Sequence, residues 1–365
     1  QLPATYPFKI GCNMQFGIHL GTRGPAASAE SLKIIATEAE TLGFAYIGLS
    51  DHVVIANTVA STYPYTASGR WFAEDTGECL DQITTLSFLA AITKKITIGT
   101  GISLLVQHDP IVLAKTVATL DHLSGGRFEF GVGRSGLPGA YEGYNISYGE
   151  SRERFFESLE IILEAFTKER FTYVGKFHSY EDVCLTPKPL QKPHPPMRIA
   201  ATTAETFPVL GRMGMPIFVG VRGLSLVDVS EQVKTYRSAL SDSDHVNGSV
   251  SLRVPVHVAE TTGEALSNCE ESFMKQFRRL GSQLGTSVKK DTADSSSERS
   301  DRSQRLSEIN WKEIQGEKVA VGDPETVASQ LNRMIDVLGL DGIAAEFNAG
   351  ETIPAGRVSK SLRLF

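Results

Sequence analysis

Apolar and polar positions along the chain alternate between two spacings. Short apolar runs, typical of buried strands, are followed by segments with apolar residues every three or four positions, typical of amphipathic helices. The predicted strands span 8–16, 45–52, 96–104, 128–132, 197–201, 216–221, 252–259 and 342–347. The predicted helices span 28–42, 83–93, 111–123, 152–167, 205–213, 227–240, 262–280 and 324–338. About eight strand–helix pairs in one chain predict an α/β fold, the closed (β/α)8 TIM barrel.

Insertions after the second, fourth and seventh strands interrupt this pattern. The segment 53–79 is aromatic, with Tyr63, Tyr65, Trp71 and Phe72, whereas 281–310 is polar, charged and of mobile character. Loops after barrel strands line the active face, so both segments are predicted to be lids; the alternative for 281–310 is a simple solvated loop. The segment 171–185 has hairpin character. We expect one domain over 1–365.

Composition narrows the classes of function. The chain has 365 residues, 41% of them hydrophobic, and a formal net charge of −6, which argues against nucleic acid as the main partner. No apolar run is long enough to span a membrane, and no signal-peptide pattern is seen at residue 1. The four cysteines are dispersed, with no C-x-x-C pair and no zinc spacing. These features predict a cytoplasmic protein with reduced thiols and no metal site.

The segment Ser124–Ser135, S-G-G-R-F-E-F-G-V-G-R-S, is the most informative stretch. A helix ends at its glycine pair, a short apolar strand follows, and Arg134 comes directly after that strand. An arginine beyond the carboxyl end of a parallel strand is well placed to bind a phosphate through two hydrogen bonds. The segment therefore predicts a phosphorylated ligand.

The same segment contains the spacing G-x-G-x-x-G at Gly131, Gly133 and Gly136. This dinucleotide fingerprint has physical meaning only where a helix opens on its third glycine. Leu137-Pro138-Gly139 follows instead, which cannot begin a helix cleanly. A Rossmann fold is therefore not expected.

Four segments carry a family resemblance. They read E-T-L-G-F-A-Y-I-G-L-S-D-H, ending at His52; I-T-I-G-T-G-I-S-L-L-V-Q-H-D-P, over 96–110; L-S-G-G-R-F-E-F-G-V-G-R-S; and V-G-D-P-E-T-V-A-S-Q-L. In order and spacing the chain resembles the bacterial luciferase-like monooxygenase superfamily, whose members are (β/α)8 barrels that use FMN or a deazaflavin. The G-R-S sequence after the fourth strand is similar to that of the FMN branch.

The resemblance implies a set of cofactor-binding residues. Arg134 and the adjacent Ser135 would meet the flavin phosphate, with Arg152 as a second cation unless it pairs with Glu150 or Glu153 on the surface. Backbone N–H groups and hydroxyls of three consecutive residues between the fifth strand and its helix would close around the same phosphate: Thr202, Thr203 and Ala204. The neighbouring Glu205 departs from the family pattern.

Gly101-Ile102 matches the position where the superfamily carries a non-prolyl cis peptide that presses on the flavin ring. The alternative is an ordinary glycine within a strand.

The resemblance also places His52, with Asp51 before it, in proton transfer during oxygen chemistry; the alternative is a structural histidine bonded to Asp51. Asn13 and Gln15, at the predicted end of the first strand, would contact the flavin or the substrate, unless the strand register turns Met14 or Phe16 inward instead. Tyr63 and Trp71 suggest a largely apolar substrate; the alternative is that these side chains pack their loop down. Two other histidines are less informative, since His108 would cap a helix or face solvent, and His257 would line a pocket or lie in the core.

The implied activity is that of a two-component monooxygenase. Reduced FMN and O2 would form a flavin hydroperoxide that oxygenates an organic substrate, and a separate NAD(P)H:flavin reductase would supply the reduced flavin. A homodimer is expected from family habit. The alternatives are a deazaflavin-dependent oxidoreductase that transfers hydride without oxygen, a flavin reductase or dehydrogenase, and a non-catalytic flavin-binding protein.

Overall fold

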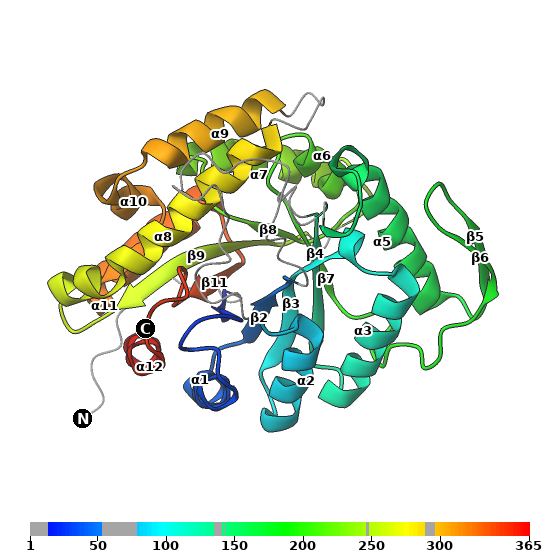
Figure 1. Cartoon of the computed structure of the whole chain (residues 1–365), viewed down its shortest axis with the longest axis horizontal. Coiled ribbons are helices and arrows are strands. Elements are labelled where there is room, and N and C mark those ends of the chain that lie inside the picture. Colours follow the sequence, from blue (N-terminus) through cyan, green and yellow to red (C-terminus); the bar gives the residue numbers. More distant parts are fainter. Residues whose placement is uncertain (1–13, 53–78, 135–140, 142, 246–247, 289–295) are drawn as a thin grey trace. The chain divides into compact units, whose positions relative to one another are not determined.

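The computed structural model describes residues 14–52, 79–134, 141, 143–245, 248–288 and 296–365 (Figure 1). Nine strands form one sheet in the order β10-β9-β11-β1-β2-β3-β4-β7-β8, and β9 also pairs with β8. This second pairing closes a ring of eight strands, with β10 beside β9. The strand bounds are β1 Gln15–Leu20, β2 Tyr46–Ser50, β3 Thr97–Leu104, β4 Phe128–Gly133, β7 Met197–Ala200, β8 Ile217–Val219, β9 Val250–Val258, β10 Ala320–Gly322 and β11 Gly342–Glu346. The predicted TIM barrel is confirmed.

Helices follow most of the strands. Their bounds are α1 Ala29–Leu42, α2 Gln82–Ile92, α3 Pro110–Ser124, α5 Ser151–Thr167, α6 Thr206–Arg212, α7 Leu226–Ser241, α8 Thr262–Val288, α9 Ser296–Glu308, α10 Trp311–Glu317, α11 Pro324–Leu338 and α12 Ala355–Leu364. Of these, α9, α10 and α12 were not predicted, nor was β10. The predicted hairpin is confirmed as the antiparallel pair β5 Phe171–Val174 and β6 Ser179–Val183.

The described residues fall in two compact units. The first unit contains the described residues within 1–47, 201–278 and 308–365, and the second contains those within 48–200 and 279–307. In the first unit, β1 and β9 each pair in parallel with β11, and β8 pairs in parallel with β9. The inner residues Ile18, Leu252 and Ile343 are almost fully buried. Burial of these branched side chains is the main stabilising term for such a core.

In the second unit, β4 pairs in parallel with β3 and β7, and Leu104 at the end of β3 lies opposite Gly133 at the end of β4. The helix α3 between these strands begins at Pro110, where the Asp109 carboxylate accepts hydrogen bonds from two backbone N–H groups. It ends at Gly125 in the left-handed conformation, as its glycine pair predicts. These caps fix where each strand starts and ends, and therefore which residues reach the carboxyl edge.

Two sequence predictions are wrong in detail. The first strand spans Gln15–Leu20 and so extends past the predicted end at residue 16, because Gln15–Ile18 pair with β11 and Ile18–Leu20 are buried; residues 8–13 lie outside the described residues. Most of the described part of 281–310 is helical, in the end of α8 and in α9, and the Ser303 hydroxyl of α9 donates to the Gly281 carbonyl of α8 at 2.8 Å. Its role as a lid stays a prediction, and 53–78 lies outside the described residues.

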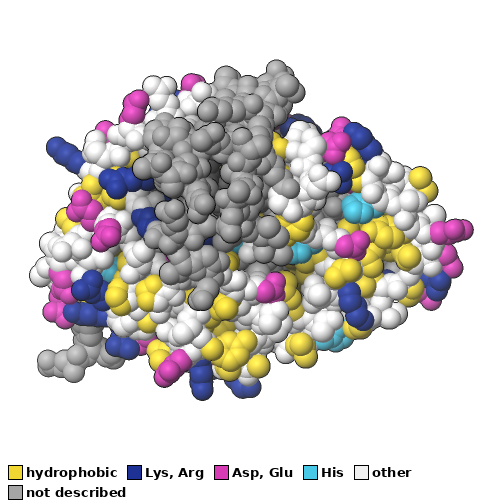
Figure 2. All heavy atoms as spheres, viewed as in Figure 1, with side chains coloured by type: hydrophobic (Ala, Val, Ile, Leu, Met, Phe, Trp, Pro, Cys, Tyr) yellow, Lys and Arg dark blue, Asp and Glu magenta, His cyan; other side chains and the backbone are white. Residues whose placement is uncertain are grey.

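Charged side chains of both signs are interspersed over the described part of the face in Figure 2, without a separate basic stripe there. Among the described helices, none has the length and apolar character needed to cross a membrane.

Candidate functional site

A buried carboxylate lies just beyond the end of β2 in the second unit. The Asp51 side chain is 1% exposed, and its Oδ2 accepts hydrogen bonds from the Leu104 backbone N–H at 2.9 Å and from His108 Nε2 at 2.7 Å. These bonds join the carboxyl edges of β2 and β3, the edge at which active sites of (β/α)8 barrels lie. A carboxylate hydrogen-bonded to an imidazole in this way can hold or move a proton.

The partner of Asp51 is a residue that sequence reasoning set aside. His108 follows the 3-10 turn Leu105–Gln107 and precedes Asp109, so the start of α3 fixes its position. It was expected to cap a helix or face solvent; instead its imidazole pairs with Asp51, and Asp109 provides the cap. The predicted catalytic residue His52 follows Asp51 and is partly exposed, and its role stays a prediction.

A second residue that sequence reasoning missed is Tyr144, between β4 and α5. Its hydroxyl oxygen is buried and has no hydrogen-bond partner among the described residues. Burial raises the pKa of Tyr144 to about 12, and the negative charge of Asp51 acts in the same direction. The phenol is therefore neutral at physiological pH and can donate one hydrogen bond. Its only sequence signal was its place shortly after the third family-like segment, which ends at Ser135.

Arg134 lies directly after β4, as predicted. Its Nη1 donates to the Ser151 hydroxyl at 3.3 Å, and Ser151 is the buried first residue of α5. No described carboxylate forms an ion pair with Arg134. A guanidinium beside a helix N-terminus is a favourable place for a phosphate, because backbone N–H groups and the helix dipole add to its charge. Arg152 is exposed in the first turn of α5, and Ser135 lies outside the described residues.

The peptide bond between Gly101 and Ile102 is not cis, contrary to the expectation from the family resemblance. The cis peptide bonds among the described residues are both X-Pro bonds elsewhere in the chain. The strand instead carries a register shift between Thr100 and Ser103. The buried Gln82 side chain explains how the trans chain is accommodated there. Its Nε2 donates to the Ile102 carbonyl at 3.1 Å and to the Leu49 carbonyl at 2.7 Å, so the carbonyl freed by the shift keeps a partner.

Gln15 is also misplaced in the sequence prediction. It is the exposed first residue of β1, opposite Gly342 at the start of β11, and so lies at the amino edge of the sheet. The error follows from the end of the strand, which lies at Leu20 rather than at residue 16. Asn13, Tyr63 and Trp71 lie outside the described residues.

Thr202, Thr203 and Ala204 lie between β7 and α6, as predicted, and the Thr203 and Thr206 hydroxyls are 2.8 Å apart. They belong to the first unit and Arg134 to the second, so their shared contact with a phosphate stays a prediction.

The first unit contains a polar cluster that the sequence analysis missed. The buried carboxylate of Glu346, at the end of β11, accepts hydrogen bonds from Arg253 at 2.7 Å, from Arg222 and from Gln276. Its members are far apart in the sequence, which left no local signal. Among the described residues, no group of three His, Cys, Asp or Glu side chains could hold a metal ion.

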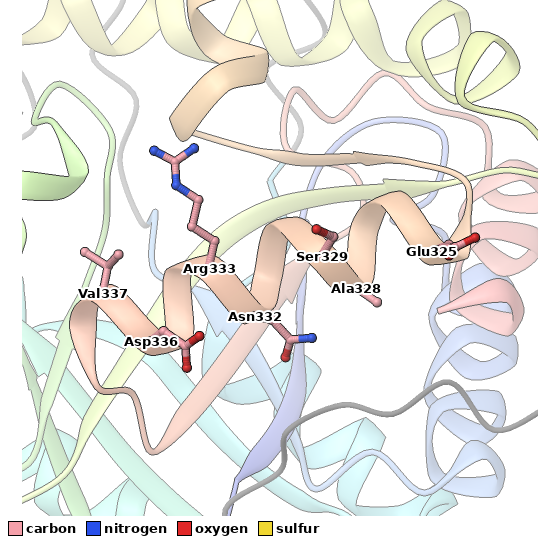
Figure 3. Close-up of a pocket in the computed structure, with 7 residues that line it drawn as sticks. All are labelled: Glu325, Ala328, Ser329, Asn332, Arg333, Asp336 and Val337. Atoms are coloured by element: carbon pink, nitrogen blue, oxygen red, sulfur yellow. The ribbon is translucent and has the colours of Figure 1, made fainter.

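Figure 3 shows the side chains of α11 that line a pocket of the structure. It contains no histidine or cysteine, and its lining residues all come from that one helix: Glu325, Ala328, Ser329, Asn332, Arg333, Asp336 and Val337. The strand-end residues around Asp51 are therefore the better candidate site.

Comparisons with known proteins agree on a family. Residues 9–341 match the profile of the family described as luciferase-like monooxygenase. An uncharacterized protein of Mycobacterium tuberculosis is 33% identical over 226 residues, which cover 60% of this chain and 76% of the relative. The 4-hydroxyprotoasukamycin monooxygenase of Streptomyces nodosus subsp. asukaensis is 28% identical over 202 residues, covering 53% of this chain and 54% of that protein.

Solved structures extend the likeness to nearly the whole chain. The monooxygenase RslO1 from Streptomyces bottropensis is 25% identical with a TM-score of 0.75, covering 96% of this chain and 97% of that one. An F420-dependent secondary alcohol dehydrogenase has the same fold at 14% identity and a TM-score of 0.72, covering 97% of this chain and 98% of that one. Similar folds thus occur in a monooxygenase and in an F420-dependent dehydrogenase.

Proposed function

Because the chain belongs to the luciferase-like monooxygenase family, we propose that it is a two-component monooxygenase that uses reduced FMN and O2 to oxygenate an organic substrate. The observation that carries this proposal is the position of Arg134, beyond the end of β4 and bonded to Ser151 at the N-terminus of α5. That arrangement suits the phosphate of FMN.

The positive charges and hydrogen-bond donors between β4 and α5 fit a flavin nucleotide. Arg134 and the first turn of α5 supply positive charge for the phosphate, with Arg152 adding to it. The buried Tyr144 hydroxyl has no partner among the residues that the structure describes, so it has a hydrogen bond to offer to a bound molecule. When bound, reduced flavin supplies the electrons that activate oxygen.

The protein would supply orientation and control of protons. Asp51, held by the Leu104 N–H and His108, is a fixed negative charge at the strand ends. His52, next along the chain, is the proposed acid–base residue. A separate NAD(P)H:flavin reductase would supply the reduced cofactor, and the working form would be a homodimer in the cytoplasm.

A deazaflavin-dependent oxidoreductase is the second candidate. It is favoured by the structural likeness to the F420-dependent alcohol dehydrogenase, whose TM-score is 0.72. Such an enzyme would transfer hydride and would not consume oxygen.

Binding and oxygen measurements separate these functions. The purified protein is titrated anaerobically with reduced FMN and, in parallel, with reduced F420, and then mixed with oxygenated buffer. The proposal expects tight FMN binding, and oxygen uptake that precedes the return of oxidised-flavin absorbance, because the bound cofactor is shielded from water. Binding of reduced F420 alone, without oxygen uptake, would establish the second candidate.

A further inference from the structure

The imidazole of His108 is held at one of its two ring nitrogens. Its Nε2 lies 2.7 Å from Oδ2 of Asp51; the Asp51 side chain is 1% exposed and that of His108 is 22% exposed. An ionised carboxylate only accepts hydrogen bonds, and Oδ2 also accepts the Leu104 N–H at 2.9 Å. Nε2 therefore carries the hydrogen of the neutral imidazole, and Nδ1 is left with a lone pair.

The second ring nitrogen, Nδ1, is open. Among the described residues, none forms a hydrogen bond with it. The adjacent carboxylate of Asp109 is engaged elsewhere, because its Oδ1 accepts the N–H groups of Ile111 and Val112 at the start of α3. Since the ring is not buried, Nδ1 can reach a bound molecule or water.

The pair lies at the edge where the proposed chemistry would occur. Asp51 directly follows β2 and Leu104 is the last residue of β3, and active sites of (β/α)8 barrels lie at the carboxyl ends of the strands. Leu104 is opposite Gly133 of β4, which Arg134 follows. Within the second unit, the imidazole and the proposed phosphate ligand therefore belong to the same edge of the sheet.

We propose that His108 is a catalytic acid–base residue of the oxygenation reaction and that Asp51 is its positioning residue. This inference rests on the proposed function and adds a second imidazole to that of His52. Nδ1 takes a proton from the reacting group, on which the bonding electron pair stays, and the imidazolium is stabilised by the buried carboxylate of Asp51. Transfer of that proton to solvent restores the neutral ring. Ser-His-Asp triads divide these tasks in the same way, with a buried carboxylate on one ring nitrogen and the chemistry at the other.

The alternative is a purely structural role, in which the bond to Asp51 only holds the start of α3 beside the end of β2. In that role the shape and the hydrogen bonds of the ring matter, and its basicity does not. Experiments that change basicity while keeping the shape therefore separate the two roles.

The first experiment needs no cofactor. Nitrogen NMR of protein labelled in its histidine rings distinguishes protonated from unprotonated ring nitrogens, and the signals of His108 are identified by their absence in His108→Gln. We expect a protonated Nε2 and an unprotonated Nδ1 at neutral pH. A proton on Nδ1 would overturn the proposal.

Chemical rescue then tests the role in the reaction. His108→Gly is loaded with reduced FMN and mixed with oxygenated buffer, and the return of oxidised-flavin absorbance is timed with added imidazole, with pyrazole or with neither. Oxidation of reduced FMN by O2 to FMN and hydrogen peroxide moves protons from the flavin to oxygen, so it reports on acid–base help without an organic substrate. Pyrazole has the ring shape of imidazole but is a much weaker base. The matched control is His122→Gln, because His122 lies at the other end of α3, where its Nε2 contacts the Lys188 carbonyl.

His108→Gly should slow this phase by about 100-fold, which is typical of a positioned acid–base group, while its FMN affinity stays that of the parent. Imidazole should recover much of the rate and pyrazole none of it. His108→Gln, which keeps an N–H donor for Asp51, should be slowed to a similar extent and serves if the glycine variant does not fold. His122→Gln should match the parent.

Equal recovery with both azoles would overturn the proposal in favour of the structural role, as would a parent-like rate in the His108 variants. A parent that fails to bind FMN or to take up oxygen would count against the proposed function. In that case the protonation state of Nδ1 alone would decide whether Asp51 orients His108 as a base.

Discussion

The imidazole of His108 lies 2.7 Å from the carboxylate of Asp51, although 57 positions separate the two residues in the sequence. The same carboxylate oxygen accepts the N–H of Leu104 at the end of β3. One side chain therefore couples the ends of two adjacent strands to the turn that starts α3. Its loss should affect stability as well as chemistry.

Replacing Asp51 by alanine should destabilise the protein. The Leu104 N–H would lose its acceptor in a buried place, at a cost of about 1–3 kcal/mol. Asp51→Asn keeps an acceptor and should cost less. Urea unfolding measures the difference, with the exposed Asp244→Ala as control. If Asp51→Ala were as stable as the parent, solvent would have to reach the freed N–H.

Replacing Arg134 by alanine should weaken FMN binding by about 10- to 100-fold, because charge-assisted hydrogen bonds contribute about 1.5–3 kcal/mol. Riboflavin, which lacks the phosphate, should bind the variant as it binds the parent. Arg134→Lys should be intermediate, since an ammonium cannot make the paired contact of a guanidinium. Quenching of flavin fluorescence measures both affinities, with Arg170→Ala as a control that alters only the hairpin pair with Asp182. Equal weakening of both flavins would contradict a phosphate contact.

Local patterns made much of the barrel predictable. The last long helix, α11, has the predicted bounds 324–338 because its signals are adjacent in sequence: Asp323 caps it, Pro324 begins it and Gly339 follows it. Such information lies within a few residues of each boundary. The same holds for Arg134, whose place follows from the short strand before it.

Long-range relationships were not predictable. The contact of Asp51 with His108 depends on how β2 lies beside β3. The position of Gln15 at the amino edge of the sheet depends on the register in which β1 pairs with β11. Neither relationship is signalled by the residues next to it in the sequence.

The glycine spacing that matches a dinucleotide fingerprint is also explained by tertiary packing. A Cβ on Gly131 would lie 2.0 Å from the Thr100 carbonyl oxygen, so this glycine is required by strand packing rather than by a pyrophosphate.

Arg198→Met should destabilise the second unit in a pH-dependent way. Glu129 in β4 is buried, and its carboxylate lies 2.6 Å from the Arg198 guanidinium on β7. Burial raises the pKa of Glu129, and the charge and hydrogen bond of Arg198 oppose that rise. Without Arg198 the carboxylate is left buried and unpaired, which costs about 3–5 kcal/mol at neutral pH.

The sign of this pH dependence follows from the raised pKa. The folded variant binds a proton more readily than the unfolded chain, so its stability should recover as the pH falls towards the ordinary range of glutamate. The double variant Glu129→Gln/Arg198→Met should regain most of the stability at neutral pH. Unfolding in urea at neutral and mildly acidic pH tests both points. A loss that is the same at both pH values would indicate a packing defect instead.

His257→Gln should make the protein less sensitive to acid. His257 lies in β9 and is 1% exposed, which answers the open sequence question in favour of the core. Burial lowers the pKa of His257 from 6.5 to about 4, with Arg357 acting in the same direction and Glu264 opposing. The unfolded chain therefore binds a proton over a pH range in which the folded protein does not. The free energy of unfolding consequently falls as the pH drops from 6.5 to about 4, by roughly 3 kcal/mol in all.

In the His257→Gln variant this contribution is absent, so its free energy of unfolding should decline less over the same pH interval. The exposed His245→Gln should follow the parent. An unchanged decline in His257→Gln would mean that the folded protein also protonates this imidazole.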